Sequence, residues 1–287
     1  MSAESYLLTL PVVRDTSVIF SSQHSGRRYS SAFLAQTLLD SQSIRSSEDA
    51  FVDVLIDTAP ACGAPLIAAQ APRAFIDLNR AEDELDPGVI DGVTRGTHNP
   101  RVSSGLGVIP RVVANGRAIY RGKIDLSDAQ ARIAQFWHPY HTALRNLIEQ
   151  SHDGFGEAIL IDVHSMPHEA LEAHSKPGYL RPDVVLGDRF GAAAGRDVMD
   201  RVEAAFVNAG LRVVRNAPFA GAYIAQVYGR PKQGQHVVQV EIDRALYLNE
   251  ARVEPSKDFA AFRKLMGGII SEIVEIGRPT ELGLAAE

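Results

Sequence analysis

Two histidines with serine directly after them follow apolar segments that have the composition of buried strands. His24 comes after "VIFSSQ", and His164 comes after "AILIDV". Ligands in open α/β sheets bind at the carboxyl ends of the strands, so the two side chains could meet there. Neutral imidazole is the commonest metal ligand in proteins, which suggests a shared metal site. The alternative is that each histidine is an ordinary loop residue.

A catalytic zinc ion usually has three protein ligands, so a third ligand is needed. The chain has one cysteine, Cys62, which leaves carboxylates and histidines as ligands. The stretch "SSEDAFVDVL" offers Glu48, Asp49 and Asp53 at the expected start of a helix. Acidic residues also stabilise a helix N-terminus without any metal. Asp49 and Asp53 are four apart and are expected on one helical face, but spacing does not choose among the three.

A competing pair of histidines lies in "WHPYHTAL". His138 and His141 are three residues apart, close enough on a helix to share a metal ion. The segment lacks the His-Glu-x-x-His arrangement of metalloproteases, and its spacing also suits a plain amphipathic helix.

Two further features could bind an acidic substrate and transfer a proton. Asn79 and Arg80 end the segment "AFIDLNR", where an amide and a planar guanidinium could hold a carboxylate. The alternative for Arg80 is an ion pair with Asp77 or with the acidic residues at 82–84. Glu241 interrupts the apolar run "HVVQVEID", where burial would raise its pKa toward that of a general base. The alternative is that it pairs with Arg244 or Arg80.

Apolar strand patterns alternate with helical patterns along the chain. We expect strands at residues 17–20, 65–69, 74–77, 158–163, 184–186, 212–214 and 237–242, and helices at 31–39, 48–61, 127–150, 192–208 and 258–276. This alternation predicts an α/β fold, a three-layer α/β/α sandwich around a mixed, mostly parallel sheet. Residues 1–287 are expected to form a single domain. A long Gly/Pro-rich loop at about 82–122 is expected to cover or line the site.

Composition excludes several classes of function. The 287 residues carry a net charge of −6 and no block of basic residues, which argues against a nucleic-acid partner. No apolar run is long enough to span a membrane, and the first residues make a poor signal peptide. The sequence therefore predicts a cytoplasmic protein.

Taken together, these segments resemble the N-formylglutamate amidohydrolase family, which is similar in fold to the zinc carboxypeptidases and aspartoacylases. The resemblance runs in order over about residues 17 to 250. Its motifs are "HSG", "EDAFVDVL", "IDLNR", "GLGVIP", "IYRG", "HPYHTAL", "LIDVHSMP", "VVLGDRFG", "PFAGAYIAQVYG" and "VVQVEIDRALY". The sequence departs from the family pattern at Ser30, at Ala222 and after Ile224. The resemblance implies a zinc-carboxypeptidase-like (phosphorylase/hydrolase-like) sheet.

The resemblance also implies roles for particular residues. The expected metal ligands are His24, Asp49 and His164, with one Zn²⁺ or another divalent ion. The expected catalytic residues are Glu241 and Arg80. The expected substrate-binding residues are Asn79, Arg80, Arg121 and Tyr223, with Arg121 as a second cation.

The implied reaction is metal-dependent hydrolysis of N-formyl-L-glutamate, or a similar N-acyl acidic amino acid, to formate and L-glutamate, as in histidine degradation. Two alternatives stay open: a carboxypeptidase or deacylase that acts on another substrate, and a non-catalytic metabolite-binding protein on the same fold. Ser25 and Ser165 lie in no Gly-x-Ser-x-Gly turn and are expected to support turns or neighbouring side chains.

Overall fold

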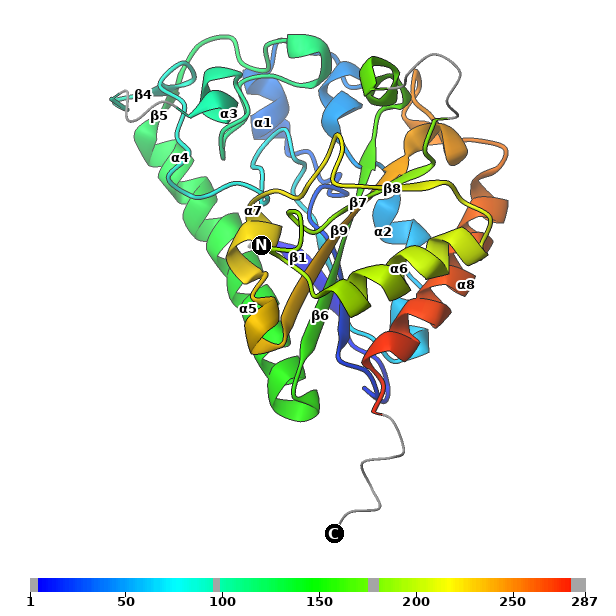
Figure 1. The fold of residues 1–287 in the computed structure, drawn as a ribbon. Helices are drawn as coiled ribbons and strands as arrows, with labels where there is room; N and C mark the ends of the chain where they lie inside the picture. The colour runs from blue at the N-terminus through cyan, green and yellow to red at the C-terminus, as the bar shows by residue number, and fades with distance from the viewer. Residues whose placement is uncertain (1–4, 95–98, 175–180, 280–287) are drawn as a thin grey trace.

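A seven-stranded sheet runs through the centre of the molecule, with helices on both faces (Figure 1). The computed structural model describes residues 5–94, 99–174 and 181–279. The strand order is β1-β3-β2-β6-β9-β7-β8. The strands are β1 Tyr6–Thr9, β2 Val18–Ser22, β3 Leu66–Ala69, β6 Ala158–Met166, β7 Val184–Gly187, β8 Val213–Arg215 and β9 Gln235–Asp243. Two short ladders complete the set: β4 Ile90–Asp91 with β5 Ile124–Asp125, and β10 Leu248–Asn249 with β11 Glu254–Pro255.

The sheet is mixed, as predicted. The neighbours β3, β2, β6 and β9 run parallel to one another, and β7 and β8 are also parallel to each other. The β1–β3 and β7–β9 pairs are antiparallel. The three-layer α/β/α sandwich with a mostly parallel sheet is therefore confirmed.

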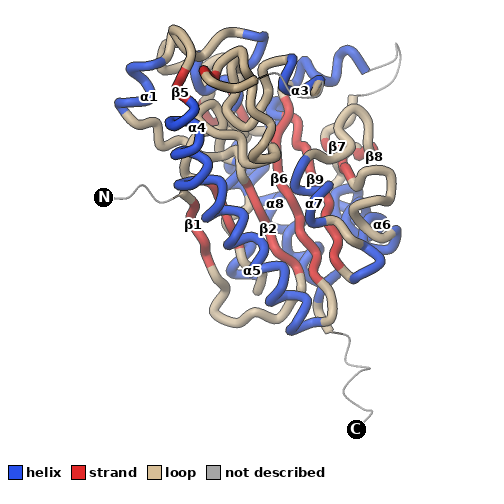
Figure 2. The backbone as a smooth tube through the Cα atoms, turned by 90° about the vertical axis from the view of Figure 1, so that its left-hand side faces the viewer, coloured by secondary structure: helices blue, strands red, loops and turns tan. Residues whose placement is uncertain are grey.

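Each face of the sheet is covered by its own helices and its own apolar core (Figures 1 and 2). One face is packed by α2 Val52–Leu55, α6 Arg196–Asn208 and α8 Phe259–Val274. The other is packed by α1 Ser31–Gln36, α4 Leu126–Arg132, α5 His138–Phe155 and α7 Tyr223–Tyr228. A π-helical turn, Ile133–Trp137, joins α4 to α5, and the short helix α3, Pro100–Ser103, lies in the 82–122 segment. The central strands are buried on both faces, which explains why they are almost continuously apolar.

Successive side chains of a strand point to opposite faces, so each strand contributes to both cores. Ile19 of β2, Leu160 of β6 and Val237 of β9 pack on the α5 side. Their direct neighbours Phe20, Ile161 and Val238 pack on the α8 side. The register pairs Ile19 with Leu160, and Leu160 with Val237, so equivalent positions of the three strands lie on one face.

Two predicted elements were wrong. Residues 74–77 form no strand, because the backbone N–H groups of Phe75 and Ile76 donate to the carbonyl of Pro72 and close a turn. The expected helix at 48–61 is reduced to α2 and a 3-10 helix, Ala59–Cys62. Phe51 has a left-handed φ of 64°, which interrupts a helix at this point. The edge strand β1 and helix α7 were not predicted.

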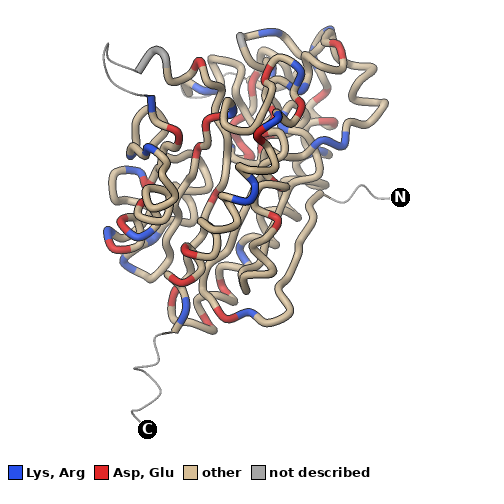
Figure 3. The backbone as a smooth tube through the Cα atoms, turned by 90° about the vertical axis from the view of Figure 1, so that its right-hand side faces the viewer, with Lys and Arg blue, Asp and Glu red and all other residues tan. Residues whose placement is uncertain are grey.

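Charged residues of both signs are interspersed along the chain, as one face shows in Figure 3. Within the described residues, no helix is long and apolar enough to cross a membrane.

His141 on α5 is almost fully buried and bonded at both ring nitrogens. Nδ1 lies 2.9 Å from the Tyr228 hydroxyl, and Nε2 lies 2.9 Å from the Leu78 carbonyl oxygen. Burial disfavours the charged ring and lowers the pKa of His141 to about 4. The folded protein therefore holds this histidine neutral at pH values where an unfolded chain would protonate it.

This burial predicts a pH-dependent contribution to stability. The contribution is complete above the unfolded pKa of about 6.5 and is lost progressively as the pH falls toward 4, amounting to about 3 kcal/mol. In urea unfolding at pH 7 and pH 5, His141→Gln should be less stable than wild type at pH 7, and the difference should shrink at pH 5. An equal difference at both pH values would show that His141 titrates alike in the two states.

Candidate active site

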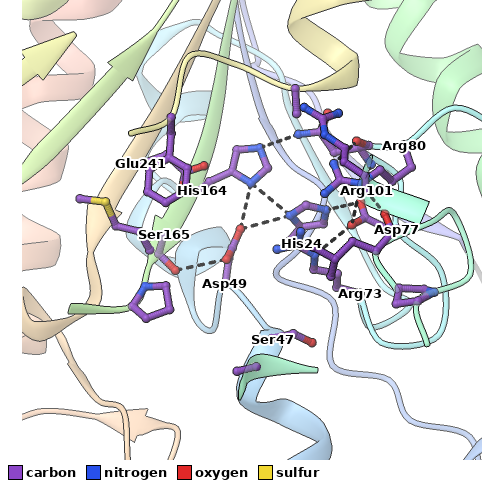
Figure 4. Close-up of a pocket in the computed structure, with 18 of the residues that line it drawn as sticks. His24, Ser47, Asp49, Arg73, Asp77, Arg80, Arg101, His164, Ser165 and Glu241 are labelled. Carbon is purple, nitrogen blue, oxygen red and sulfur yellow. Dashed lines mark hydrogen bonds and ion pairs between the residues drawn. The ribbon is translucent and has the colours of Figure 1, made fainter. Parts of the chain in front are cut away.

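His24, Asp49 and His164 converge at the carboxyl edge of the parallel strands (Figure 4). His24 follows β2, His164 belongs to β6, and Asp49 lies between the 3-10 helix Ser43–Ser47 and α2. The Asp49 backbone N–H donates to the His24 carbonyl at 3.0 Å, which holds these two segments together. All three side chains are buried.

Three possible ligand atoms face a common point. His164 Nδ1 lies 2.9 Å from Asp49 Oδ2 and 3.1 Å from His24 Nδ1, and His24 Nδ1 lies 3.4 Å from Asp49 Oδ2. Ligands about 2.0 Å from a tetrahedral ion are ~3.3 Å from each other, close to these separations. Two imidazole nitrogens and one carboxylate oxygen in this arrangement could hold one divalent metal ion.

The other nitrogen of each histidine faces a buried carboxylate. His24 Nε2 lies 2.7 Å from Asp77 Oδ1, and His164 Nε2 lies 3.1 Å from Asp162 Oδ2. A carboxylate at this position stabilises the N–H on Nε2 and leaves the Nδ1 lone pair for a metal, as in many metal sites. The amide nitrogens of Gln23 and Asn79 also lie against His164 Nε2, at 2.6 and 3.2 Å. Because Nε2 of each ring carries its hydrogen toward a carboxylate, Asp77 and Asp162 are the groups that hold the two rings from behind.

Asp162 is held by two residues of β2 and the loop after it. Ser21 Oγ donates to Asp162 Oδ1 at 2.7 Å, and Gln23 Nε2 donates to Oδ2 at 3.2 Å. Burial opposes charge on His164, but the Asp162 and Asp49 carboxylates outweigh it and raise the pKa of His164 well above its usual value. This strong attraction for positive charge is what a cation-binding cluster requires.

Asp49 also contacts an arginine on the side away from the histidines. Arg244 Nη2 lies 3.1 Å from Asp49 Oδ1, and Arg244 Nε donates to Ser165 Oγ at 3.1 Å. Burial alone would raise the pKa of Asp49, but its hydrogen bonds with His164 and His24 hold that pKa well below the usual value. The carboxylate is therefore ionised, with Oδ2 facing the histidines.

Glu241 lies on β9 directly opposite His164 in the strand register. Gln239, two residues earlier on the same face, donates from Nε2 to Glu241 Oε1 at 2.9 Å. Among the residues that the structure describes, Glu241 forms no ion pair, so the predicted alternative of a partner arginine is wrong. Burial raises the pKa of Glu241 to about 7. A carboxylate with this pKa can exchange a proton near neutral pH.

Asn79 and Arg80 lie beside the histidines on the turn after Asp77. Asn79 Oδ1 accepts from the Ile224 backbone N–H at 2.8 Å. Arg80 donates from Nε to the Leu106 carbonyl and from Nη1 to the Asn79 carbonyl. Its Nε is 4.0 Å from Asp77 Oδ2, at the outer limit of an ion pair, so backbone carbonyls provide most of its support. These bonds leave N–H groups of Arg80 available for a ligand.

These groups line a cavity of about 560 Å³. One wall comes from the 82–122 segment, which contributes Arg101, Leu106 and Pro110 among others. Another comes from the loop before α7, with Phe219 and Gly221. The long loop therefore lines the site, in the place where the sequence predicted it.

The structure separates the alternatives that spacing left open. Glu48 points away from the cluster to Arg45 and Tyr29, and Asp53 pairs with Arg27 at 2.8 Å. Asp49 and Asp53 do not share a helical face. Helix α2 begins at Val52, after the left-handed Phe51, so Asp53 is in the helix and Asp49 is not.

The competing pair, His138 and His141, does not bring its ring nitrogens together as ligands of one metal site. His141 uses both ring nitrogens in the core, as described above. His138 is half exposed and lies 3.1 Å from Glu82.

Two predicted substrate-binding residues lie elsewhere. Arg121 is exposed and lines a separate surface depression near Gln36 and Asp128. The ring of Tyr223 packs against Trp137 and His141 and does not line the 560 Å³ cavity. The structure therefore places neither residue in the cavity lining: the arginine that lines it from the loop is Arg101, and the α7 region contributes Gly221 and Ala222.

Sequence reasoning missed several supporting residues. Asp162 and Gln23 were not singled out. Asp162 is a polar residue within an otherwise apolar strand segment, and Gln23 is a polar residue just after a strand. The informative pattern was polar residues two apart at adjacent strand ends: Ser21 with Gln23, Asp162 with His164, and Gln239 with Glu241. Ser25 and Ser165 have the expected supporting roles, since Ser25 Oγ donates to the Ser22 carbonyl and Ser165 accepts from Arg244.

A buried His-Asp-His cluster with a carboxylate of raised pKa and an Asn-Arg pair, at the carboxyl edge of an α/β/α sheet, defines a hydrolase-type site that could hold a metal ion. Comparison with known sequences makes the assignment specific: the chain belongs to the N-formylglutamate amidohydrolase family, whose profile matches residues 16–248. It is an amidohydrolase that acts on a C–N bond other than a peptide bond.

Curated relatives and a solved structure that are similar to the chain carry the name of this family's activity. The N-formylglutamate deformylases of Pseudomonas putida and Pseudomonas aeruginosa are 29% and 30% identical to the chain, and each alignment covers 81% of this chain and 82% of the relative. The crystal structure of N-formylglutamate amidohydrolase from Ralstonia eutropha JMP134 has a TM-score of 0.89 and 32% identity, covering 96% of this chain and 99% of that one. A gene product of Agrobacterium tumefaciens shares the fold, with a TM-score of 0.62 and 15% identity over 95% of this chain and 97% of that one.

The geometry predicts one divalent ion per chain. Metal-free protein titrated with Zn²⁺ in a competition assay with a chromophoric chelator should bind one equivalent tightly. His164→Ala should weaken binding at least 100-fold, because it removes one of three ligands. His138→Ala, which changes a half-exposed histidine outside the cluster, should bind like wild type. Equal binding by His164→Ala and wild type would contradict the assignment of the site.

Proposed function

We propose that this protein hydrolyses the amide bond of N-formyl-L-glutamate to formate and L-glutamate, with a divalent metal ion bound by His24, Asp49 and His164. The observation that carries the proposal is the convergence of His24 Nδ1, Asp49 Oδ2 and His164 Nδ1 in a cavity that also contains Glu241 and Arg80. The names of the relatives support the substrate. A role in cytoplasmic histidine degradation, implied by the resemblance, is part of the same proposal.

Zn²⁺ is the expected ion, because two imidazoles and one carboxylate with an open position are typical of catalytic zinc sites. When bound, such an ion lowers the pKa of a water molecule and polarises the carbonyl of the scissile amide. The chain's own contribution is to fix the three ligand atoms. Asp77 and Asp162 hold the histidine rings from behind, and Arg244 holds the outer oxygen of Asp49.

Glu241 is proposed as the general base and then the general acid. Its Oε1 is occupied by the Gln239 amide, which leaves Oε2 to take a proton from the attacking water. The C–O bond forms at the formyl carbon, and the C–N bond breaks as Glu241 gives the proton to the departing amino nitrogen. A carboxyl pKa of about 7 suits both transfers.

Asn79 and Arg80 are proposed to bind the substrate α-carboxylate. The Asn79 amide nitrogen lies beside the His164 ring with hydrogens available for a ligand, and Arg80, a residue that is 6% exposed, presents free N–H groups. A charge-assisted hydrogen bond in such a buried position is strong and directional. In this role the pair orients the formyl group relative to His24, Asp49, His164 and Glu241.

The reaction predicts formate release that depends on metal. Zn²⁺-loaded protein incubated with N-formyl-L-glutamate should yield equal amounts of formate and glutamate, measured by formate dehydrogenase coupling and amino-acid analysis. Chelation should abolish the activity, and added Zn²⁺ should restore it. If the Zn²⁺-loaded protein releases formate from no N-formyl amino acid, the proposed substrate is wrong. If it then cleaves another N-acyl group or a C-terminal peptide bond, the proposed metal-dependent hydrolysis still holds.

Glu241→Gln tests the proton-transfer role. This variant keeps the shape and the contact with Gln239 but cannot take up a proton, so kcat should fall by about 100- to 10,000-fold. Its zinc stoichiometry should stay at that of wild type, because Glu241 is not a proposed ligand. Near-normal kcat in Glu241→Gln would exclude it as the base.

A further inference from the structure

We propose that Arg101 binds the side-chain carboxylate of the substrate and thereby determines the preference for acidic N-formyl amino acids. The inference rests on the proposed function and assigns a residue to the second negative charge of N-formylglutamate. Arg101 belongs to α3, in the loop segment 82–122, and its side chain lines the 560 Å³ cavity together with the groups described above (Figure 4).

Among the residues that the structure describes, four arginines line this cavity, and three of them already have partners in the protein. Arg73 pairs with Asp77 at 3.0 Å, and Arg244 pairs with Asp49 at 3.1 Å. Arg80 is held by two backbone carbonyls. Within residues 5–94, 99–174 and 181–279, the guanidinium of Arg101 forms no hydrogen bond or ion pair with another side chain or carbonyl. Its charge is therefore available to a ligand.

Arg101 and Arg80 are close enough to influence each other electrostatically. Burial lowers the pKa of Arg80, and the positive charges of Arg73 and Arg101 lower it further. Two guanidinium groups that face one cavity repel each other unless an anion lies between or beside them. A ligand with two carboxylates would relieve this repulsion better than a ligand with one.

The backbone around Arg101 is well anchored, so its side chain starts from a fixed position. Asn99 caps the helix by accepting from the Arg101 and Val102 backbone N–H groups, at 2.9 and 3.4 Å. The Arg101 carbonyl accepts from the Leu106 N–H at 2.8 Å. Leu106 in turn accepts from Arg80 Nε, so the two arginines are linked through one short stretch of backbone.

This arrangement divides the two substrate carboxylates between two arginines. Arg80, with Asn79, lies next to His164 and binds the carboxylate nearest the scissile bond. Arg101 enters the same cavity from the loop segment, near Arg80, and binds the carboxylate at the end of the side chain. An N-formyl amino acid with a neutral side chain would leave Arg101 unpaired, and it would bind more weakly.

The test compares two substrates of almost the same shape, N-formyl-L-glutamate and N-formyl-L-glutamine, in steady-state assays. Wild type should prefer the glutamate substrate. In Arg101→Gln, the ratio of the two kcat/KM values should fall roughly 10- to 100-fold, the value of one charge-assisted contact. Arg101→Lys should retain part of the preference. Arg80→Met should lower both kcat/KM values together, because both substrates carry the α-carboxylate.

Arg121→Gln is the matched control, since Arg121 is in the same loop segment but exposed and outside the cavity. It should keep the wild-type ratio. An unchanged ratio in Arg101→Gln would overturn the proposal, even if overall activity fell. A wild-type protein that hydrolyses neither substrate would refute the proposed function itself, whereas one that hydrolyses both without preference would refute only the role of Arg101.

Discussion

The parallel register of β2, β6 and β9 is the constraint on which the site depends. Ser21 pairs with Asp162, and His164 pairs with Glu241, so three strands bring their polar residues to one edge. Because side chains alternate between faces, the polar pairs continue the line of Ile19, Leu160 and Val237 on the α5 side. The same face is thus apolar at one end of each strand and polar at the other. A shift of one residue in either pairing would turn one strand's polar residues into the opposite apolar core.

Burying this many charges is possible only because each has a partner. Asp77 would lose its charge in an apolar environment, but His24, Arg73 and Arg80 keep its pKa well below the usual value. Removing one partner of such an ion pair destabilises the fold far more than the net contribution of the pair to stability suggests, because the other charge stays buried without a partner. Glu241 is the exception: burial outweighs the neighbouring charges of His164, Arg73 and Arg244, and its pKa rises to about 7. This difference in pKa distinguishes the ionised carboxylates that hold the side chains of the site in place from Glu241, which is suited to transfer a proton.

The strands and the two histidines could be predicted because their signals are local, whereas only the family resemblance favoured Asp49 over Glu48 and Asp53. Apolar runs located β2, β6 and β9, and polar residues at their ends located His24, His164 and Glu241. Helix and loop geometry was harder to predict. The segments around the left-handed Phe51 and after the Pro72 turn are held by distant parts of the chain, through the bonds from the Asp49 N–H to the His24 carbonyl and from the Asp77 N–H to the Val108 carbonyl. Arg101 and Arg121 both lie in or beside irregular loop structure, and only the three-dimensional course of that loop shows which one faces the cavity.

Charge balance links the metal, the loop and the substrate. The buried carboxylates of the site are Asp49, Asp77, Asp162 and Glu241, and the buried arginines beside them are Arg80 and Arg244, with Arg73 partly exposed. With the histidines neutral, as metal binding requires, and with Glu241 ionised, these groups leave one net negative charge. The proposed divalent ion and Arg101 would together convert it to two positive charges. N-formylglutamate carries two carboxylates and would neutralise them, while a substrate with one carboxylate would leave a positive charge unpaired in a partly desolvated cavity. The electrostatics that accommodate the metal therefore also favour a substrate with two negative charges.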